Sequence, residues 1–71
     1  MKELLKRQIE CDLQNLQESE DIPGTGKYRK RLVEDIRKAT RDIGREDGYI
    51  RLNGVAFEAG EKWLNEQGIE L

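Results

Sequence analysis

Apolar positions in the first quarter of the chain recur at the spacing of an α-helix. Within residues 2–18, the apolar side chains three to four positions apart are Leu5, Ile9, Leu13 and Leu16. At about 100° per residue, this spacing places them on a single stripe, as in a helix that packs against a core. We therefore predict a helix over residues 2–18, which ends before the turn-forming segment SEDIPGTG.

A second and more regular pattern follows this turn and predicts a helix over residues 26–43. Its apolar stripe consists of Tyr28, Leu32, Ile36, Ala39 and Ile43. Thr25 is in the position of an N-cap, where its hydroxyl would accept a backbone N–H, and Gly44 stands where a helix commonly stops. Because the connection is short, we expect the two helices to fold back as an antiparallel hairpin.

The next segment, residues 49–58, predicts a β-hairpin. Asn53-Gly54 is a strong signal for a two-residue turn, here between strands 49–52 and 55–58. This register collects the apolar side chains of both strands on one face. The alternative is that Asn53 caps a helix that begins at Gly54, since VAFEAGEKWL also tolerates a helix. We favour the hairpin because a one-residue slip would destroy its sorting of apolar and polar side chains.

The last element is a short helix over residues 59–67. Gly68 follows it at the stop position, and Ile69 is expected to pack back on Leu64. The predicted fold is thus a single small domain, residues 1–71, of a mostly α (α+β) class. An isolated pair of strands is not stable in water, so the β-hairpin should rest on the helical hairpin.

Composition limits how such a chain can be stabilised. It has 71 residues, 35% of them hydrophobic, one cysteine and no histidine. A single cysteine excludes an internal disulfide, and without histidine a lone thiol cannot assemble a structural zinc site. Because small scaffolds often need a further stabilising element, a homodimer and a monomer both remain open. An uncharged strip on the first helix predicts a self-association surface or, alternatively, a mildly polar face: Leu4, Gln8, Cys11 and Asn15.

Catalysis is not expected from this set of side chains. The absence of histidine excludes a Ser-His-Asp triad, and Cys11 has no activating base among its helix neighbours. The segment GTGK looks like part of the nucleotide-binding loop G-x-x-x-x-G-K-[ST]. In that alignment Asp21 replaces the first glycine and Tyr28 replaces the small hydroxyl, so we predict a turn and no bound phosphate. We expect a protein that is not an enzyme, with no cofactor and no metal.

The charge and the lack of long apolar runs limit where the protein is expected to be located and what it is expected to bind. Charged residues form 39% of the chain, with a net charge of −2, and no apolar run approaches the roughly 18 residues that cross a membrane. The N-terminal segment MKELLKRQIE lacks the apolar stretch of a secretory signal. We therefore expect no membrane contact and a cytoplasmic protein with a reduced cysteine.

The basic residues are nevertheless concentrated in one segment. Residues 25–45 contain eight basic and three acidic residues, a local charge of +5. Lys30, Arg37 and Arg41 align on the predicted second helix, away from its apolar stripe. The alternative is an ordinary paired helix surface, because several opposite charges are four positions apart: Arg31–Asp35, Glu34–Lys38 and Lys38–Asp42.

These features favour a function in binding. Our leading hypothesis is a small non-catalytic regulator, inhibitor or assembly adaptor of bacterial or phage type, which binds another protein. The alternative is a nucleic-acid-binding protein that uses Lys30, Arg37 and Arg41. In element order, the stretch GYIRLNGVAFEAGEKWL resembles the wing and closing helix of winged-helix DNA-binding domains. That resemblance covers less than half of the chain, and the third helix that should precede the hairpin is missing.

Overall fold

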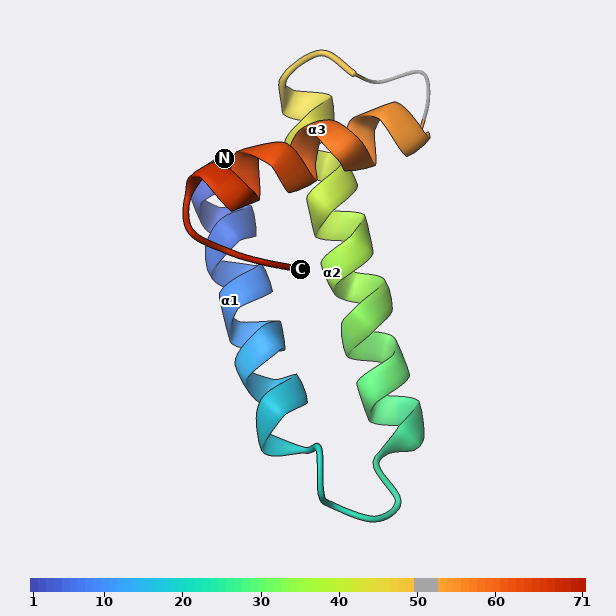
Figure 1. Cartoon of the computed structure of the whole chain (residues 1–71). Helices are drawn as coiled ribbons and strands as arrows, with labels where there is room; N and C mark the ends of the chain where they lie inside the picture. The colour runs from blue at the N-terminus through green and yellow to red at the C-terminus, as the bar shows by residue number, and fades with distance from the viewer. Residues whose placement is uncertain (50–52) are drawn as a thin grey trace.

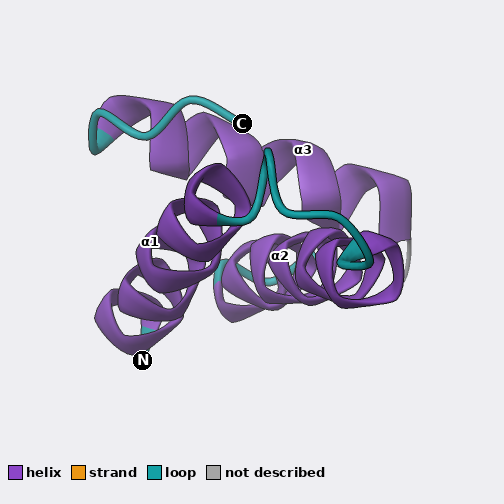
Figure 2. Cartoon of the chain, turned by 90° about the horizontal axis from the view of Figure 1, so that it is seen from below, coloured by secondary structure: helices purple, strands orange, loops and turns teal. Residues whose placement is uncertain are grey.

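The fold consists of three helices in a computed structural model that describes residues 1–49 and 53–71. They are α1 (Lys2–Glu18), α2 (Gly26–Glu46) and α3 (Asn53–Glu66). Helices α1 and α2 lie side by side and antiparallel, and α3 crosses them at the end where α1 begins and α2 finishes (Figure 1). Seen from below, α3 lies on one side of the hairpin only (Figure 2). We call the end that carries α3 the upper end and the other the lower end.

The first predicted helix is confirmed at both bounds. Ile9 is fully buried, and Leu5, Leu13 and Leu16 are partly buried against the same core. The stripe of α2 is also confirmed for its four inner members, but Tyr28 is 47% exposed and does not belong to the core. Tyr28 lies in the first turn of α2, far from α3, so neither of the neighbouring helices covers it.

Helix α2 is longer than predicted and continues to Glu46. The glycine that ends it is Gly48, with φ +97°. Its N–H donates to the Arg45 carbonyl at 3.0 Å, and the Tyr49 N–H donates to the Gly44 carbonyl at 3.3 Å, which is the Schellman pattern. Thr25 is the N-cap residue as predicted, but its hydroxyl makes no cap hydrogen bond.

The predicted β-hairpin is wrong. The turn Asn53-Gly54 and the second strand 55–58 form the first turns of α3, whereas residues 50–52 of the first strand lie outside the described residues. The described part of the chain contains no strand, so the class is all-α rather than α+β. The C-terminal helix predicted over residues 59–67 is the second part of α3, which already starts at Asn53. The alternative that the sequence left open, a helix that begins at Gly54 with Asn53 as its cap, is correct in type, but α3 begins one residue earlier, at Asn53.

Close packing of α2 against α3 explains this outcome. A Cβ on Gly44 would collide with the backbone of Ala56, and a Cβ on Gly60 would collide with the backbone of Thr40. Small residues four positions apart on both helices therefore let the two backbones approach at two points. A helix over residues 53–66 brings Ala56 and Gly60 onto one face, whereas a β-hairpin would not.

The core lies at this upper end and combines all three helices with the tail. Its buried members are Ile9, Ile36, Ala39, Ile43, Leu64 and Ile69. The predicted stop of the last helix is confirmed: Gly68 has φ +86°, and the Ile69 N–H donates to the Leu64 carbonyl at 2.9 Å. This turn sends the tail back across α1, toward the space between α1 and α2 (Figure 1).

Lys2 adds a polar link at the same end. Its ammonium forms an ion pair with Asp47, just after α2, and lies 5.4 Å from the centre of the Trp63 ring on α3. One side chain at the start of α1 thus contacts both other helices. The lower end has no equivalent of α3 and consists of two helices and their connection.

Candidate functional site

An apolar groove runs along the hairpin directly below α3. It has a volume of about 320 Å³, and the side chains that line it are Leu13, Leu16, Val33, Ile36, Arg37, Phe57, Glu61 and Leu71. Six of these eight are apolar. A concave apolar surface with a few charged groups at its border is the usual form of a binding site.

Each wall of the groove has a separate origin. The α1 and α2 walls are the flanks of the two apolar stripes, where Val33 remains 39% exposed because no third helix covers it. Phe57 closes the upper end from α3, and Leu71 reaches it because the turn at Gly68 directs the tail inward. The site therefore depends on the hairpin, on α3 and on the tail together.

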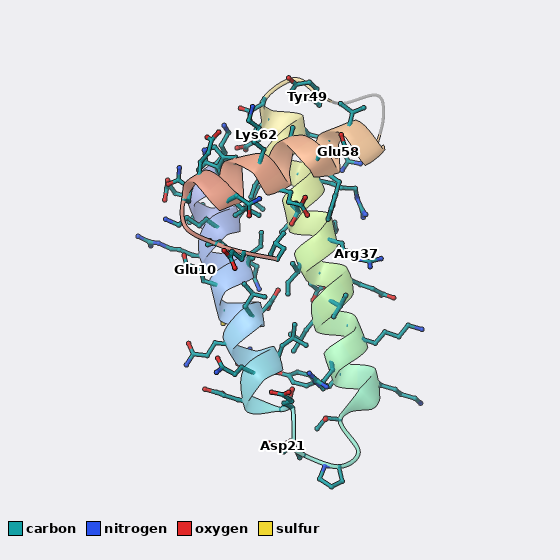
Figure 3. The ribbon with its side chains drawn as sticks, viewed as in Figure 1. Glu10, Asp21, Arg37, Tyr49, Glu58 and Lys62 are labelled. Atoms are coloured by element: carbon teal, nitrogen blue, oxygen red, sulfur yellow. The ribbon has the colours of Figure 1, made fainter. Side chains whose placement is uncertain are left out.

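The basic row borders this groove on the α2 side. Arg37 is one of the lining residues and lies on α2 below the crossing with α3 (Figure 3). Lys30 and Val33 share its face of the helix, at i−7 and i−4. Arg41 is half-buried, one turn higher, next to the level at which Thr40 meets α3. Of the basic row, the structure thus brings Arg37 into the lining of the groove, with Lys30 two turns below it on the same face of α2 and Arg41 one turn above it.

Lys30, Arg37 and Arg41 form no ion pair within the part of the chain that the structure describes. Its only ion pairs, among residues 1–49 and 53–71, are Lys2–Asp47 and Arg45–Asp42. The three i, i+4 pairs that the sequence offered are therefore not formed. Lys30 and Arg37 are exposed and available to an anionic group outside this chain.

A buried carboxyl lies on the opposite side of the hairpin. Asp12 is only 4% exposed, and Gln8 donates a hydrogen bond of 3.2 Å to its Oδ1, but its Oδ2 has no partner in the described residues. Burial raises the pKa of the Asp12 carboxyl above its ordinary value, the Gln8 hydrogen bond lowers it, and the charge of Asp35 raises it further. This acid was not singled out in the sequence, because position 12 lies at the edge of the apolar stripe of α1.

The uncharged strip predicted for self-association lies along α1 as expected from its spacing. Leu4 is 63% exposed, Gln8 and Cys11 are exposed, and Asn15 is half-buried. The Asn15 amide contacts the Cys11 thiol at 3.9 Å. The strip and the groove share no residue, so they are separate surfaces.

The other surface features that the structure describes are less suited to binding an apolar partner. A larger depression of about 690 Å³ lies between α1 and the tail and is lined mainly by carboxylates and amides, among them Glu10, Gln17 and Glu70. In the bend before α2, the Thr25 hydroxyl donates to the carbonyls of Ile22 and Ser19.

Across residues 1–49 and 53–71, no cluster of three acidic or cysteine side chains could hold a metal ion. No described helix has both the length and the apolar character to cross a bilayer.

Comparison with known proteins identifies no relative, because neither a family model nor a curated protein nor a solved structure matches this chain. The candidate site therefore rests on its own geometry. Of the lining residues, the sequence singled out Arg37 as a candidate binding residue but not Phe57 or Leu71. Phe57 had been placed on a strand, and Leu71 is positioned only by the tertiary turn at Gly68.

Proposed function

We propose that this protein is a small non-catalytic regulator, inhibitor or assembly adaptor that binds another protein through the groove below α3. The observation that carries the proposal is the apolar groove itself, lined by six apolar side chains and bordered by exposed basic residues. An apolar surface that a monomer leaves open, with charge at its rim, is typical of a protein-interaction site.

A matched pair of variants tests this proposal. Val33 and Val55 are 39% and 40% exposed, but only Val33 lines the groove. The tagged protein and the variants Val33→Glu and Val55→Glu would be used to capture partners from a lysate of the source organism. We expect Val33→Glu to lose a partner that the wild type and Val55→Glu retain. Equal capture by both variants would contradict the proposed site.

Nucleic acid is the second candidate. It is supported by the basic row, because no intramolecular ion pair of Lys30, Arg37 or Arg41 is formed among the described residues. The part of the predicted wing from Asn53 onward belongs to α3, so among the described residues the proposed contacts come from α2. A mobility-shift titration at two salt concentrations tests this function, with a Lys30→Ala, Arg37→Ala, Arg41→Ala triple variant as the control. No shift at low salt would rule it out.

We also propose self-association through the strip Leu4, Gln8, Cys11 and Asn15, supported by the 63% exposure of Leu4. Sedimentation of Leu4→Glu tests it: the variant should dissociate while its helices remain folded, and unchanged sedimentation would exclude this surface. The exposed thiol of Cys11 fits a reducing compartment, which supports a cytoplasmic location.

A further inference from the structure

The shape of the groove favours one kind of occupant. Two antiparallel helices form its sides, and at the upper end of the same face α3 packs across α2 (Figure 2). Below α3, one turn of α1 with Leu13 and Leu16 lies across from one turn of α2 with Val33 and Ile36. A helix placed there would bury a narrow apolar stripe of residues at i, i+3, i+4 and i+7, as in other helix-in-groove complexes.

The charges beside the groove then select among helices. Lys30 and Arg37 are seven residues apart, so they stand about 10 Å apart along the same side of α2. Across the groove, α1 contributes only Leu13 and Leu16 to the lining and therefore no charged side chain. Among the lining residues, a docked helix would therefore meet a basic side chain only on its α2 side, and the one carboxylate is that of Glu61 on α3, at the upper end. Acidic residues at a spacing of seven on the α2 side would pair with both cations.

We infer that the groove binds an amphipathic helix of another protein, whose apolar stripe is flanked by acidic residues on the side that faces α2. This inference rests on the proposed function and adds the chemistry of the partner. It also predicts a different set of essential residues from those that nucleic-acid binding would need. Phosphates would need only Lys30 and Arg37, whereas a helix also needs the apolar lining around Val33.

The test uses two synthetic helical peptides of about 18 residues with the same leucine stripe. One has glutamate at the flanking positions, and the other has lysine at the same positions. Each is labelled with a fluorophore, and its binding to the full chain is measured by fluorescence anisotropy at low and moderate salt. We expect the glutamate peptide to bind at least tenfold more tightly than the lysine peptide, with the difference decreasing as salt is added.

Two double variants have the same spacing and the same change in charge. Lys30→Glu/Arg37→Glu reverses the charge beside the groove, whereas Arg31→Glu/Lys38→Glu reverses it on another side of α2, where Lys38 borders a different depression with Asp35 and Asp42. The first should reverse the preference between the peptides, and the second should leave it in favour of glutamate. Val33→Glu should weaken the binding of both peptides at least tenfold. Val33→Ser repeats this test without adding charge. Circular dichroism confirms that each variant remains helical.

The possible results distinguish this inference from the proposed function. Equal binding of both peptides would overturn the inference that the partner helix is acidic, while a groove that binds helices would still be supported. Absence of binding by either peptide overturns the inference, and the Val33-dependent capture experiment then decides separately whether a protein binds there. Dimerisation of the wild type that Val33→Glu abolishes would make a second copy the occupant and overturn the inference. DNA binding that survives Val33→Glu but not the Lys30/Arg37 double variant would overturn both.

Discussion

The two ends of the helical hairpin are built from the same kinds of residues but packed differently. At the upper end, α3 lies so close to α2 that Gly44 and Gly60 have no room for a Cβ. At the lower end, no helix covers α1 and α2 on the same face, and Val33 and Tyr28 remain exposed. The upper end holds the fully buried side chains Ile43 and Leu64, whereas the groove begins directly below them.

This difference indicates a division of roles between the two ends. A chain of 71 residues has a small reserve of stability, and here most of its buried apolar surface is concentrated where three helices meet. The lower end contributes less to this core: Leu32 is buried there, but Val33 and Tyr28 stay accessible. Substitutions at the two ends should therefore have very different effects on the free energy of unfolding.

The largest effect is expected for Gly44→Val. The added Cβ would collide with the Ala56 backbone rather than with a movable side chain, so α2 and α3 would have to separate. We expect the free energy of unfolding to fall by at least about 4 kcal/mol, measured by urea denaturation followed by circular dichroism. Gly54→Ala is the matched control in α3, because nothing lies near its added Cβ, and it should gain about 0.5 kcal/mol. A small loss at Gly44 would show that the crossing is not tight.

The next prediction compares one apolar side chain from each end. Ile43 is fully buried, so Ile43→Ala should cost about 3 kcal/mol of unfolding free energy. Val33 is 39% exposed at the groove, and Val33→Ala should cost less than about 1 kcal/mol. The same denaturation measurement checks both. Similar losses at the two positions would contradict the division between the ends.

The sequence predicts the hairpin well because the apolar stripes of α1 and α2 are long and regular. It does not predict α3 correctly, since Asn53-Gly54 between short apolar runs is compatible with a turn and with a helix start. The contact that decides between them, Ala56 on Gly44, joins residues twelve positions apart and is a tertiary effect. The available signal was the repeated spacing of small residues, Thr40 and Gly44 on α2 with Ala56 and Gly60 on α3. For the same reason the sequence did not predict the part of the groove that Phe57 and Leu71 form, since α3 and the turn at Gly68 position these side chains.

A smaller effect is expected for Asp12→Asn on the other side of the hairpin. Burial raises the pKa of Asp12 above its ordinary value of 3.8, so the folded state holds this proton more tightly than the unfolded state. The free energy of unfolding should therefore decrease as the pH rises above that value. At neutral pH, where the Asp12 carboxyl is ionised in both states, the decrease is complete. Asparagine retains an oxygen that can accept the bond from Gln8 and carries no charge.

We expect Asp12→Asn to be more stable than the wild type by about 1 kcal/mol at pH 7, with the difference disappearing below the ordinary pKa of an aspartate. Denaturation at several pH values from 3 to 7 measures it. Asp35→Asn serves as a partial control, because Asp35 contributes to the same pKa but is itself exposed. A wild type that is the more stable protein at pH 7 would contradict this explanation.

The smallest effect is expected at Lys2, which joins the three helices at the upper end. Its ion pair with Asp47 and its contact with Trp63 are partly exposed, so Lys2→Gln should cost only about 0.5 kcal/mol. Adding salt should reduce the difference from the wild type, and thermal melting at two salt concentrations measures this. A loss as large as that of Ile43→Ala would mean that polar contacts rather than apolar packing hold the upper end together.

Native-state amide hydrogen exchange on the protein alone is the most direct test of the division between the two ends. If stability resides at the α2–α3 crossing, amides from Ala39 to Glu46 should exchange only when the whole protein unfolds. Those in the second turn of α2, from Arg31 to Val33, should exchange through smaller openings, at least about 100-fold faster. Uniform protection along α2 would show that the lower end is as firmly folded as the upper, and would contradict the account.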